Sequence, residues 1–358
     1  MTRAARPLLW PLVPAYRLAL ELREFELRAG LKPVRRLRWP VVSIGNLSAG
    51  GAGKTPLTIA LAKALKARGV HVDVLSRGYS RRRSAVPLSV ESSGAAEDFG
   101  DEPLEVAREA GVPVFVATER YEAGVLAEAG KSAAADESAG QQVSESESQK
   151  ISRPAKRELC AHLLDDGFQH RQLHRDVDIL LLSRNDLDDH LLPAGNLREA
   201  LHAAERADVL AIPDDQPEVT DWTGSQGWDK PRWRLRRRMD VPQIDGPVVA
   251  FCGIARPDQF FEGLESAERD RAGLRVVARF AFADHHRYTA GDLTRIAAGA
   301  QKAGATALVT TEKDRVRLGE LAADLAAAIP LTTASLRVEF EDEAAAIDWL
   351  IGRIRAAG

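Results

Sequence analysis

Short apolar runs separate amphipathic stretches along most of this chain of 358 residues. Runs of four to seven residues rich in Val, Ile and Leu are typical of buried strands, and apolar residues spaced three or four apart are typical of helices. Helical patterns lie between many of these runs, which predicts an α/β protein whose parallel sheet has helices on both faces. We expect strands at 41–44, 70–75, 112–116, 159–164, 176–182, 209–212, 248–254, 276–282 and 307–310.

Two stretches interrupt this alternation. Residues 130–158 are mostly Ser, Ala, Glu, Gln and Lys, and a segment with so little apolar surface to bury is expected to be a disordered surface insertion. Residues 216–246 are rich in Pro, Gly, Asp and Trp, and the part at 232–236 alternates as an exposed strand does. We expect this second stretch to connect, as a hinge, a first domain at 41–215 to a smaller α/β domain at 247–358 that ends in a helix.

The first expected strand leads directly into a glycine-rich loop, and an alanine-rich helical pattern follows at 57–65. In a phosphate-binding loop, backbone N–H groups converge on anionic oxygens, a lysine reaches the outer phosphates and a hydroxyl holds Mg²⁺. Ser48 replaces the first glycine of the usual pattern. An ordinary glycine-rich turn is the alternative, and the position of Gly-Lys-Thr at the helix start argues against it. The residues expected to bind the nucleotide are Ser48, Ala49, Gly50, Gly51, Ala52, Gly53, Lys54 and Thr55.

Two adjacent carboxylates, Asp165 and Asp166, follow the apolar run at 159–164. A strand that ends in Asp is typical of the element that binds Mg²⁺ in nucleotide-dependent enzymes. Two neighbouring carboxylates are costly to hold together unless a cation shares them. A strand ending in a capping Asp is the alternative. We therefore expect a nucleotide and Mg²⁺ as cofactors, bound to a P-loop NTPase-like parallel sheet.

Composition argues against several other classes of protein. The net charge of −3 argues against a nucleic-acid-binding protein that relies on bulk charge. The two cysteines, Cys160 and Cys252, are isolated, show no metal-ligand spacing and suit a reducing compartment. No uncharged apolar run is long enough to span a bilayer.

The first 40 residues differ from the rest of the chain in charge. They hold nine Lys or Arg against three Glu, a local net charge of +6. Leu9, Val13, Tyr16 and Leu20 follow helical spacing, while interrupting prolines and the lack of a small-residue cleavage site argue against a signal peptide. A basic amphipathic segment with Trp10 is typical of a helix on a membrane surface. The alternative is a helix that packs on the protein's own core and leaves its basic face solvated.

Phosphoryl transfer to an alcohol also needs a group that accepts the hydroxyl proton. Asp101 and His285 are candidates because each lies in a polar loop near expected strands, where the sites of α/β proteins form. An Asp–His pair could act together as the base. The sequence alone does not bring the two residues together across about 180 positions, and single histidines are more often plain surface or core residues.

Several motifs occur together in one order along the chain. They are Gly45–Ser48 before the phosphate loop, then Ser76–Tyr79, Gly100–Pro103, Asp165–His170, Leu192–Glu199, Ala283–His285 and Thr311–Asp314. This set resembles the tetraacyldisaccharide 4′-kinases, the lipid A 4′-kinases of Gram-negative bacteria. The resemblance runs from about residue 8 to 350, and the insertion at 130–158 departs from the family's usual length.

The resemblance implies a reaction and a place for it. The reaction is ATP-dependent phosphorylation of the 4′-hydroxyl of an acylated glucosamine disaccharide 1-phosphate, a lipid A precursor. The place is the cytoplasmic face of the bacterial inner membrane, where the basic N-terminal segment at 1–40 would seat the enzyme as a peripheral protein. The resemblance gives no reason to expect a protein partner or a nucleic acid.

The resemblance also implies roles for individual residues. Lys54 and Thr55 would bind phosphates and Mg²⁺, and Asp165 and Asp166 would belong to the metal site. Asp101 would be the general base, assisted by His285. The residues implied to line the rest of the site are Arg77, Glu102, Arg120, Gln169, His170, Arg198 and Glu199.

Two rival functions stay open from the sequence. A membrane-associated P-loop ATPase switch would need the phosphate loop and the carboxylates at 165 and 166, but would give no reason for Asp101 or His285. A kinase for another sugar or lipid alcohol would need the same groups as a lipid A 4′-kinase. The sequence alone does not exclude this second rival.

Overall fold

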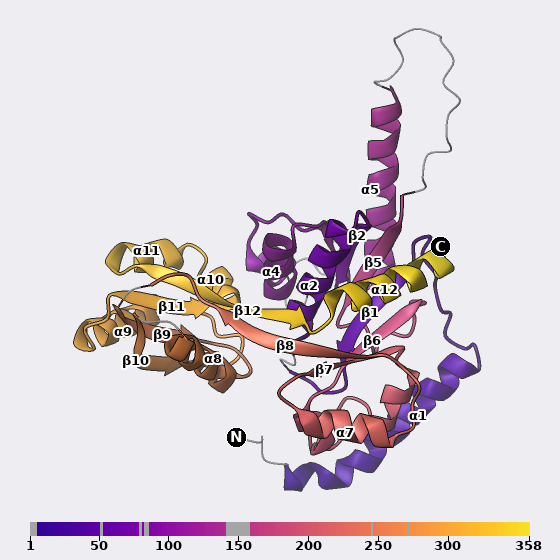
Figure 1. Cartoon of the computed structure of the whole chain (residues 1–358), viewed down its shortest axis with the longest axis horizontal. Coiled ribbons are helices and arrows are strands. Elements are labelled where there is room, and N and C mark those ends of the chain that lie inside the picture. The colour runs from indigo at the N-terminus through magenta and orange to yellow at the C-terminus, as the bar shows by residue number, and fades with distance from the viewer. Residues whose placement is uncertain are drawn as a thin grey trace.

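The computed structural model of the chain describes residues 6–50, 53–78, 81, 86–140, 158–244, 246–270 and 273–358, with the backbone alone at 132–140 and 270. Within these residues, twelve strands form one sheet in the order β10-β9-β11-β12-β8-β7-β6-β1-β5-β2-β4-β3. Figure 1 shows two lobes that are joined through the middle of this sheet. The expected α/β class, with a mostly parallel sheet, is confirmed.

The first lobe is built on seven strands that come early in the chain. The central strand β1 lies between β5 and β6 and is parallel to both. Every residue of β1 is buried because side chains on both faces of the strand pack against apolar neighbours. The strands are β1 (Val41–Asn46), β2 (His71–Ser76), β3 (Leu88–Ser89), β4 (Val114–Val116), β5 (Cys160–Asp165), β6 (Val177–Leu181) and β7 (Val209–Pro213). The helices are α2 (Lys54–Ala67), α3 (Ala96–Phe99), α4 (Asp101–Ala110), α5 (Arg120–Gly140), α6 (Arg184–Leu187), η2 (Leu201–Arg206) and α7 (Pro217–Ser225).

The second lobe repeats the α/β pattern on a smaller scale. Its strands β9 (Gly246–Cys252), β10 (Leu274–Ala281) and β11 (Ala307–Thr311) are parallel to one another where they pair. Two apolar clusters, one on each face of these strands, form its core. Its helices are α8 (Pro257–Asp270), α9 (Ala290–Lys302), α10 (Glu312–Leu318) and α11 (Leu321–Ala328).

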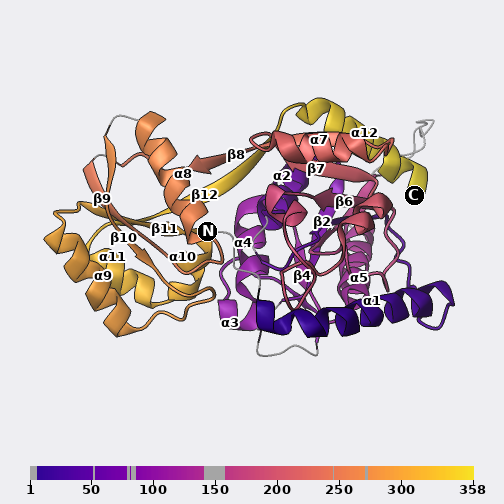
Figure 2. The ribbon, with the colours of Figure 1, turned by 90° about the horizontal axis from the view of Figure 1, so that it is seen from below.

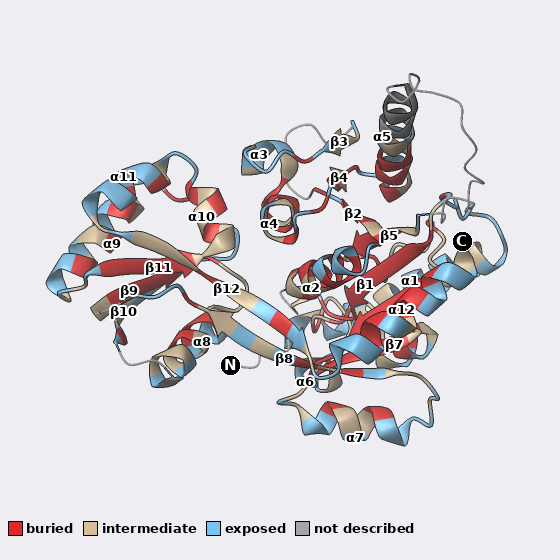
Figure 3. Cartoon of the chain, turned by 45° about the horizontal axis from the view of Figure 1, so that its top comes forward, coloured by how far each residue is buried: buried red, intermediate tan, exposed pale blue. Residues whose placement is uncertain are grey.

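Two long strands, β8 (Arg232–Asp240) and β12 (Leu331–Phe340), carry the chain between the lobes. The first part of β8 pairs in parallel with β7, and its later part pairs antiparallel with β12. The first part of β12 pairs with β11. The stretch expected to be an inter-domain connection is therefore part of the sheet itself. Figure 3 shows that much of this ribbon is intermediate or exposed, whereas β1 is buried.

Helix α12 (Glu343–Ala357) lies in the first lobe, not in the second domain to which the sequence analysis assigned it. Its apolar face joins the core cluster that contains Val42 and Leu57 of the first lobe. The reason is that β12 brings the chain back across the ribbon, so α12 packs beside α2 (Figure 1). The buried residues of that face are those expected from their helical spacing, Ile347, Leu350, Ile351 and Ile354.

The insertion expected at 130–158 begins later than the sequence analysis placed it. Helix α5 continues to Gly140, so residues 130–140 are helical. Ala, Lys and Glu in this stretch have high helix propensity, and extending an existing helix needs no new nucleus. Residues 141–157 lie outside the described part of the chain.

The N-terminal segment forms η1 (Pro7–Leu12) and α1 (Val13–Arg28), which lie along the surface of the first lobe (Figure 2). No residue of either helix is buried. Leu18, Leu22 and Phe25 fall at helical spacing on one side of α1 and are each more than half exposed. No helix in the described ranges has the length and apolar character needed to cross a membrane.

A buried polar network fixes the segment after α1 to the sheet. His162 on β5 is fully buried, with Nδ1 2.7 Å from Asp73 Oδ1 and Nε2 3.4 Å from Glu128 Oε1. The same Glu128 oxygen accepts the backbone N–H groups of Arg38 and Trp39. Burial lowers the pKa of His162, but the carboxylates of Asp73 and Glu128 outweigh burial and raise it to about 9.

We predict that this network makes the protein less stable as the pH rises from 6.5 to 9. The folded chain holds the His162 proton more tightly than the unfolded chain, whose pKa is 6.5. The stabilising contribution is therefore complete below pH 6.5 and is lost as the pH rises through about 9. A shift of this size corresponds to at most about 3 kcal/mol of unfolding free energy. Chemical denaturation at a series of pH values measures it.

The matched variants for this test are His162→Gln and His202→Gln, since His202 is exposed. His162→Gln should be less stable than the wild type at pH 6.5 and should lose most of the decline toward pH 9. His202→Gln should keep the wild-type decline. The same decline in all three proteins would contradict a proton held by this network.

Candidate active site

The phosphate loop joins the carboxyl end of β1 to the amino end of α2. Gly50 and Gly53 have φ angles of +107° and +91°, which favour glycine. Gly45 meets a different constraint, because a Cβ there would overlap Phe168, whose loop packs directly against β1. Gly50 and Gly53 are therefore required by the backbone conformation of the loop, and Gly45 is required by close packing against Phe168.

Ser48, which replaces the usual first glycine, is buried in the loop. Its Oγ accepts a hydrogen bond from Asn46 Nδ2 at 3.1 Å, and the next residue, Ala49, lies in the wall of a cavity described below. A serine at this position therefore stabilises the loop through its hydrogen bond with Asn46. Gly51 and Ala52, which were also expected to bind the nucleotide, lie outside the described residues.

A cluster of charges holds Lys54 beside the end of β5. Its Nζ donates to Asn46 Oδ1 at 2.8 Å and lies 3.3 Å from Asp166 Oδ1. Arg198 binds both oxygens of Asp166, at 2.8 and 3.0 Å, and also donates to Asn46 Oδ1. Burial opposes the charge on Asp166, but Lys54 and Arg198 outweigh burial and hold its pKa well below the usual range. Two cations are thus fixed at the mouth of the phosphate loop.

The neighbouring Asp165 forms no ion pair with the described residues. Its Oδ1 accepts a hydrogen bond from the Thr58 hydroxyl at 3.0 Å. Burial, and then the charges of Glu102 and Asp166, raise the pKa of Asp165 to about 6. The Asp165 carboxylate, which has no ion-pair partner among the described residues, suits a divalent ion as a ligand. Thr55 at the start of α2 offers a hydroxyl as a second ligand.

Asp101 and His285 meet at the junction of the lobes. Asp101 is the first residue of α4, and His285 follows β10. His285 Nδ1 lies 3.2 Å from Asp101 Oδ2, and Arg317 of α10 donates to the same oxygen through Nε at 2.9 Å and through Nη2. Burial opposes ionisation of Asp101, but hydrogen bonds from His285 and Arg317 outweigh burial and lower its pKa. The hydrogen bond to Asp101 in turn raises the pKa of His285.

Two site residues share an unusual backbone conformation. His285 and Asp166 have φ angles of +57° and +51°, and no other non-glycine residue in the described part of the chain has a positive φ. Such strain is uncommon outside glycine and concentrates at functional sites, where surrounding contacts hold it. In both cases ion-pair partners on other elements hold the side chain.

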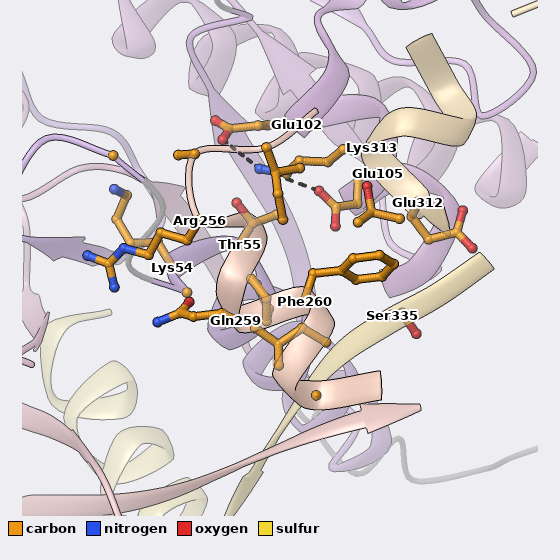
Figure 4. A pocket seen from close by; sticks show the side chains of 18 of the residues that line it. Lys54, Thr55, Glu102, Glu105, Arg256, Gln259, Phe260, Glu312, Lys313 and Ser335 are labelled. Carbon is orange, nitrogen blue, oxygen red and sulfur yellow. Dashed lines mark hydrogen bonds and ion pairs between the residues drawn. The ribbon is translucent and has the colours of Figure 1, made fainter. Parts of the chain in front are cut away.

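Two cavities meet between the lobes. The larger, of about 760 Å³, extends from the phosphate loop to α8 and β12, and Figure 4 shows Lys54 and Thr55 in its wall together with Phe260 of α8. The smaller, of about 410 Å³, includes Asp101 in its wall. A ligand in the larger cavity would face a ligand in the smaller one across the side chains that both cavities share. The shared residues are Glu102, Asp166, Arg198 and His285.

The smaller cavity gathers most of the residues that were expected to line the site. Glu199 is different, because it lines neither of these two cavities. Its carboxylate lies 2.7 Å from Arg206, which in turn covers the ring of Phe168, and this pair draws Glu199 away from the cavity. The expected residues in the wall of the smaller cavity are Arg77, Glu102, Arg120, Gln169, His170 and Arg198.

The smaller cavity is rich in positive charge. Four arginines stand in its wall, including Arg23 from α1, which the sequence analysis did not single out. Burial, and then the charge of Arg120 and other arginines, lower the pKa of His170 to about 4, so this imidazole is neutral near pH 7. Guanidinium groups around a neutral imidazole suit an anionic ligand such as a phosphate.

Sequence reasoning gave no role to Asn46, Lys313 or Arg317, although Lys313 lies in the recognised Thr311–Asp314 motif. Asn46 lies inside a recognised motif, but the pattern does not show that its side chain accepts from two cations. Lys313 and Arg317 are four residues apart on α10, so they share one helix face, which was the available signal. Nothing in the sequence indicates that this face meets α4.

A cavity at a phosphate loop that adjoins a second cavity across charged side chains is typical of a P-loop kinase, and this is the class that the fold defines. The chain belongs to the tetraacyldisaccharide-1-P 4′-kinase family, whose family model matches residues 5–355. It is therefore an enzyme of the kinase class. The match covers both lobes and the N-terminal helices.

Individual relatives agree with the family match. The tetraacyldisaccharide 4′-kinase of Koribacter versatilis (strain Ellin345) is 39% identical over 335 residues, with 88% of this chain and 89% of the relative covered. That of Anaeromyxobacter sp. (strain K) is 36% identical over 365 residues, with 94% and 87% covered. A crystal structure of LpxK from Aquifex aeolicus in complex with ATP is similar at a TM-score of 0.68 and 29% identity, covering 98% of this chain and 99% of that one.

We predict that Lys54→Met weakens the binding of Mg-ATP about ten- to a hundredfold. The substitution keeps the apolar stem and removes a cation from the wall of the larger cavity. A hydrogen bond to a charged group contributes about 1.5–3 kcal/mol, and about 1.4 kcal/mol is tenfold in affinity. Calorimetric titration with a non-hydrolysable ATP analogue measures the change.

The control for this variant is Lys63→Met, on the exposed side of the same helix. It should bind the analogue as the wild type does. If Lys54→Met also bound it with wild-type affinity, Lys54 would have no phosphate-binding role.

Proposed function

We propose that the chain transfers the γ-phosphoryl group of ATP to the 4′-hydroxyl of an acylated glucosamine disaccharide 1-phosphate in lipid A biosynthesis. The observation that carries this proposal is the meeting of two cavities, one beside Lys54 and one beside Asp101. ATP would occupy the larger cavity, because that cavity begins at the phosphate loop, and the similar structure from Aquifex aeolicus is a complex with ATP. The relatives named tetraacyldisaccharide 4′-kinase supply the identity of the acceptor.

The transfer needs a place for the hydroxyl proton. The sugar oxygen forms a bond to the γ-phosphorus, the bond from that phosphorus to the oxygen of the β-phosphate breaks, and ADP leaves. Asp101, held ionised by Arg317 and His285, would accept the hydrogen bond of the acceptor hydroxyl. His285, whose pKa is raised by the hydrogen bond to Asp101, would hold the proton after transfer.

Lys54 and Arg198 would face the triphosphate. Both already have a fixed position through Asn46 and Asp166, so little reorganisation is needed when a phosphate arrives. Charge-assisted contacts of this kind both bind the phosphates and orient the γ-phosphoryl group toward the acceptor. The loop glycines leave the backbone N–H groups accessible to the same anion.

Mg²⁺ would be held by Thr55 and Asp165 together with the phosphates of ATP. No group of three or more His, Cys, Asp or Glu side chains within the described ranges could hold a metal ion by itself. This suits Mg²⁺, which is commonly bound by one or two carboxylates and by substrate phosphates. When bound, the ion would neutralise charge on the phosphates. We assign Asp166, whose oxygens are both bound by Arg198, to holding the cations in place.

The place of action would be the cytoplasmic face of the inner membrane. Leu18, Leu22 and Phe25 form a stripe on α1 with exposed fractions of 56%, 55% and 62%. From another side of the same helix, Arg23 reaches the smaller cavity. The stripe would enter the membrane interface while the sugar enters the cavity, and the basic N-terminal segment at 1–40 favours anionic lipid.

We predict that the purified protein transfers label from γ-labelled ATP to the acylated disaccharide 1-phosphate in detergent micelles with Mg²⁺. Asp101→Asn should lower kcat about 10²- to 10⁴-fold, because the amide cannot take the proton. The KM for ATP should change little, since Asp101 lies in the other cavity. Chromatographic separation of the labelled lipid measures both.

The control is Asp98→Asn, an exposed carboxylate three residues earlier, which should keep full turnover. ATP hydrolysis without labelled lipid would favour an ATPase switch instead. Faster transfer to another sugar or lipid alcohol would favour a kinase for that acceptor. Full turnover of Asp101→Asn would remove the proposed base.

We also predict that replacing Leu18, Leu22 and Phe25 by Ser weakens binding to anionic lipid vesicles at least about tenfold, because the stripe supplies apolar area to the interface. Sedimentation with the vesicles measures bound protein. Val125→Ser, a change at an exposed apolar residue of α5, is the control and should bind as the wild type does. Undiminished binding of the triple variant would rule out the stripe as the membrane contact.

A further inference from the structure

Helices α4 and α10 turn opposite charges toward each other across the junction of the lobes. Lys313 Nζ lies 2.8 Å from Glu102 Oε1 and 3.8 Å from Glu105 Oε2 (Figure 4). One turn further along α10, Arg317 binds Asp101, and its side chain is 8% exposed. These ion pairs connect the helix that carries the proposed base with the lobe that carries His285.

We propose that Arg317 is a positioning residue for phosphoryl transfer, because it holds Asp101 and His285 next to each other. Lys313 would hold α4 in the position that this contact needs. The inference rests on the proposed function of the site. The second lobe would then position the catalytic base as well as line the nucleotide cavity.

The contacts of Asp101 show which oxygen would meet the substrate. Arg317 and His285 both approach Oδ2. Oδ1 has no hydrogen-bond partner among the residues that the structure describes, and Asp101 stands in the wall of the smaller cavity. The acceptor hydroxyl would therefore meet Oδ1, with the orientation of the carboxylate fixed through its other oxygen.

Arg317 is itself held rigidly from the second lobe. Its Nη1 donates to the Gly253 carbonyl at 2.5 Å and lies 3.4 Å from Asp314 Oδ1. Asp314 is buried and accepts from the Gly253 N–H at 3.0 Å and from the Thr311 hydroxyl at 2.6 Å. The guanidinium is thus fixed before it meets Asp101, which limits the entropy lost in holding that carboxylate.

The same backbone carbonyl also ties His285 to Arg317. The His285 N–H donates to Gly253 O at 3.2 Å, so one carbonyl receives both residues. A Cβ at position 253 would stand 3.0 Å from His286 Cβ and 3.2 Å from Asp314 Oδ1, which leaves a side chain little room. Arg317, His285 and Gly253 therefore form one unit that meets Asp101 from the second lobe.

The charge of Arg317 acts on both members of the pair in the same direction. It favours the ionised form of Asp101 and disfavours the protonated form of His285, so removing it should raise both pKa values. Without Arg317, the base would therefore lose its proton at a higher pH than in the wild type, whether Asp101 or His285 is the titrating residue. The other ionisable groups that face the pair or its cations are Asp284, Asp314, Lys313, Glu102 and Glu105. Of these, burial raises the pKa of Glu105 to about 8, so it is mostly protonated at neutral pH.

The test is the pH profile of lipid phosphorylation by Arg317→Gln and Arg317→Lys. Arg317→Gln should lower kcat about a hundredfold, as a misplaced base does, leave the KM for ATP within about threefold, and move the acid limb of the profile to higher pH. Arg317→Lys keeps the charge but lacks the planar fork. It should keep the acid limb near the wild-type position and recover part of kcat.

Arg315→Gln on the same helix is the control, because Arg315 forms no ion pair with the described residues. It should keep the wild-type profile. An Arg317→Gln enzyme with the wild-type kcat, or one slowed with an unmoved acid limb, would overturn the positioning role. If Arg317→Gln does not fold, Arg317→Lys decides, and an acid limb displaced to higher pH despite the retained charge would overturn it. Failure of the wild type to label the lipid would instead overturn the proposed function.

Discussion

Carboxylates crowd the junction of the two lobes, and the structure depends on the cations that keep Asp101 and Asp166 ionised there. Asp166 is satisfied by Lys54 and Arg198, whereas Asp165, without a close cation, has its pKa raised to about 6. In the proposed reaction, the phosphates of ATP would add negative charge beside these cations, and a divalent ion would balance part of it. On the other side of the junction, Lys313 and Arg317 of α10 pair with the carboxylates of Glu102 and Asp101 on α4.

The N-terminal helix is fastened to the same loops that build the site. The Tyr16 hydroxyl donates to the Arg198 carbonyl at 2.9 Å, and Arg23 donates to the Gln169 carbonyl at 2.5 Å. Both contacts are to backbone, so they hold the loops themselves and not a single side chain. Force or tilt that a membrane applied to α1 would therefore reach the wall of the smaller cavity directly, without passing through the core.

The sequence predicts those parts of the site whose residues are neighbours in the chain. The phosphate loop from Ser48 to Thr55 and the pair at 165 and 166 each combine a strand end with a polar turn, which local patterns report well. The contact of Asp101 with His285 and Arg317 joins elements from two lobes, and no periodicity encodes it. The apolar set expected in the N-terminal segment, Leu9, Val13, Tyr16 and Leu20, is only partly exposed, and Tyr16 donates to the Arg198 carbonyl. The exposed stripe of Leu18, Leu22 and Phe25 lies on another face of the helix and was not predicted.

The fold shows the same division between local and distant information. Most strands and the apolar face of α12 follow from hydrophobic spacing, but the sequence analysis did not predict β3 or the long strand β12. The assignment of α12 to the second domain was wrong, because the spacing of Ile347 and Leu350 shows that a helix has a buried face but not what covers it. The start of the insertion was misplaced for a related reason, since polar composition alone does not separate a polar helix from a disordered segment.

Because of the paired strands β8 and β12, the second lobe is inserted between two parts of the chain that both belong to the first lobe. The chain leaves the first lobe along β8 and returns along β12, so the apolar core beside α2 is completed by residues near the very end of the chain. During synthesis, the first lobe would leave the ribosome long before α12 exists to cover that core. The apolar surface of α2 that α12 covers would then be open to chaperones or to other chains until α12 emerges.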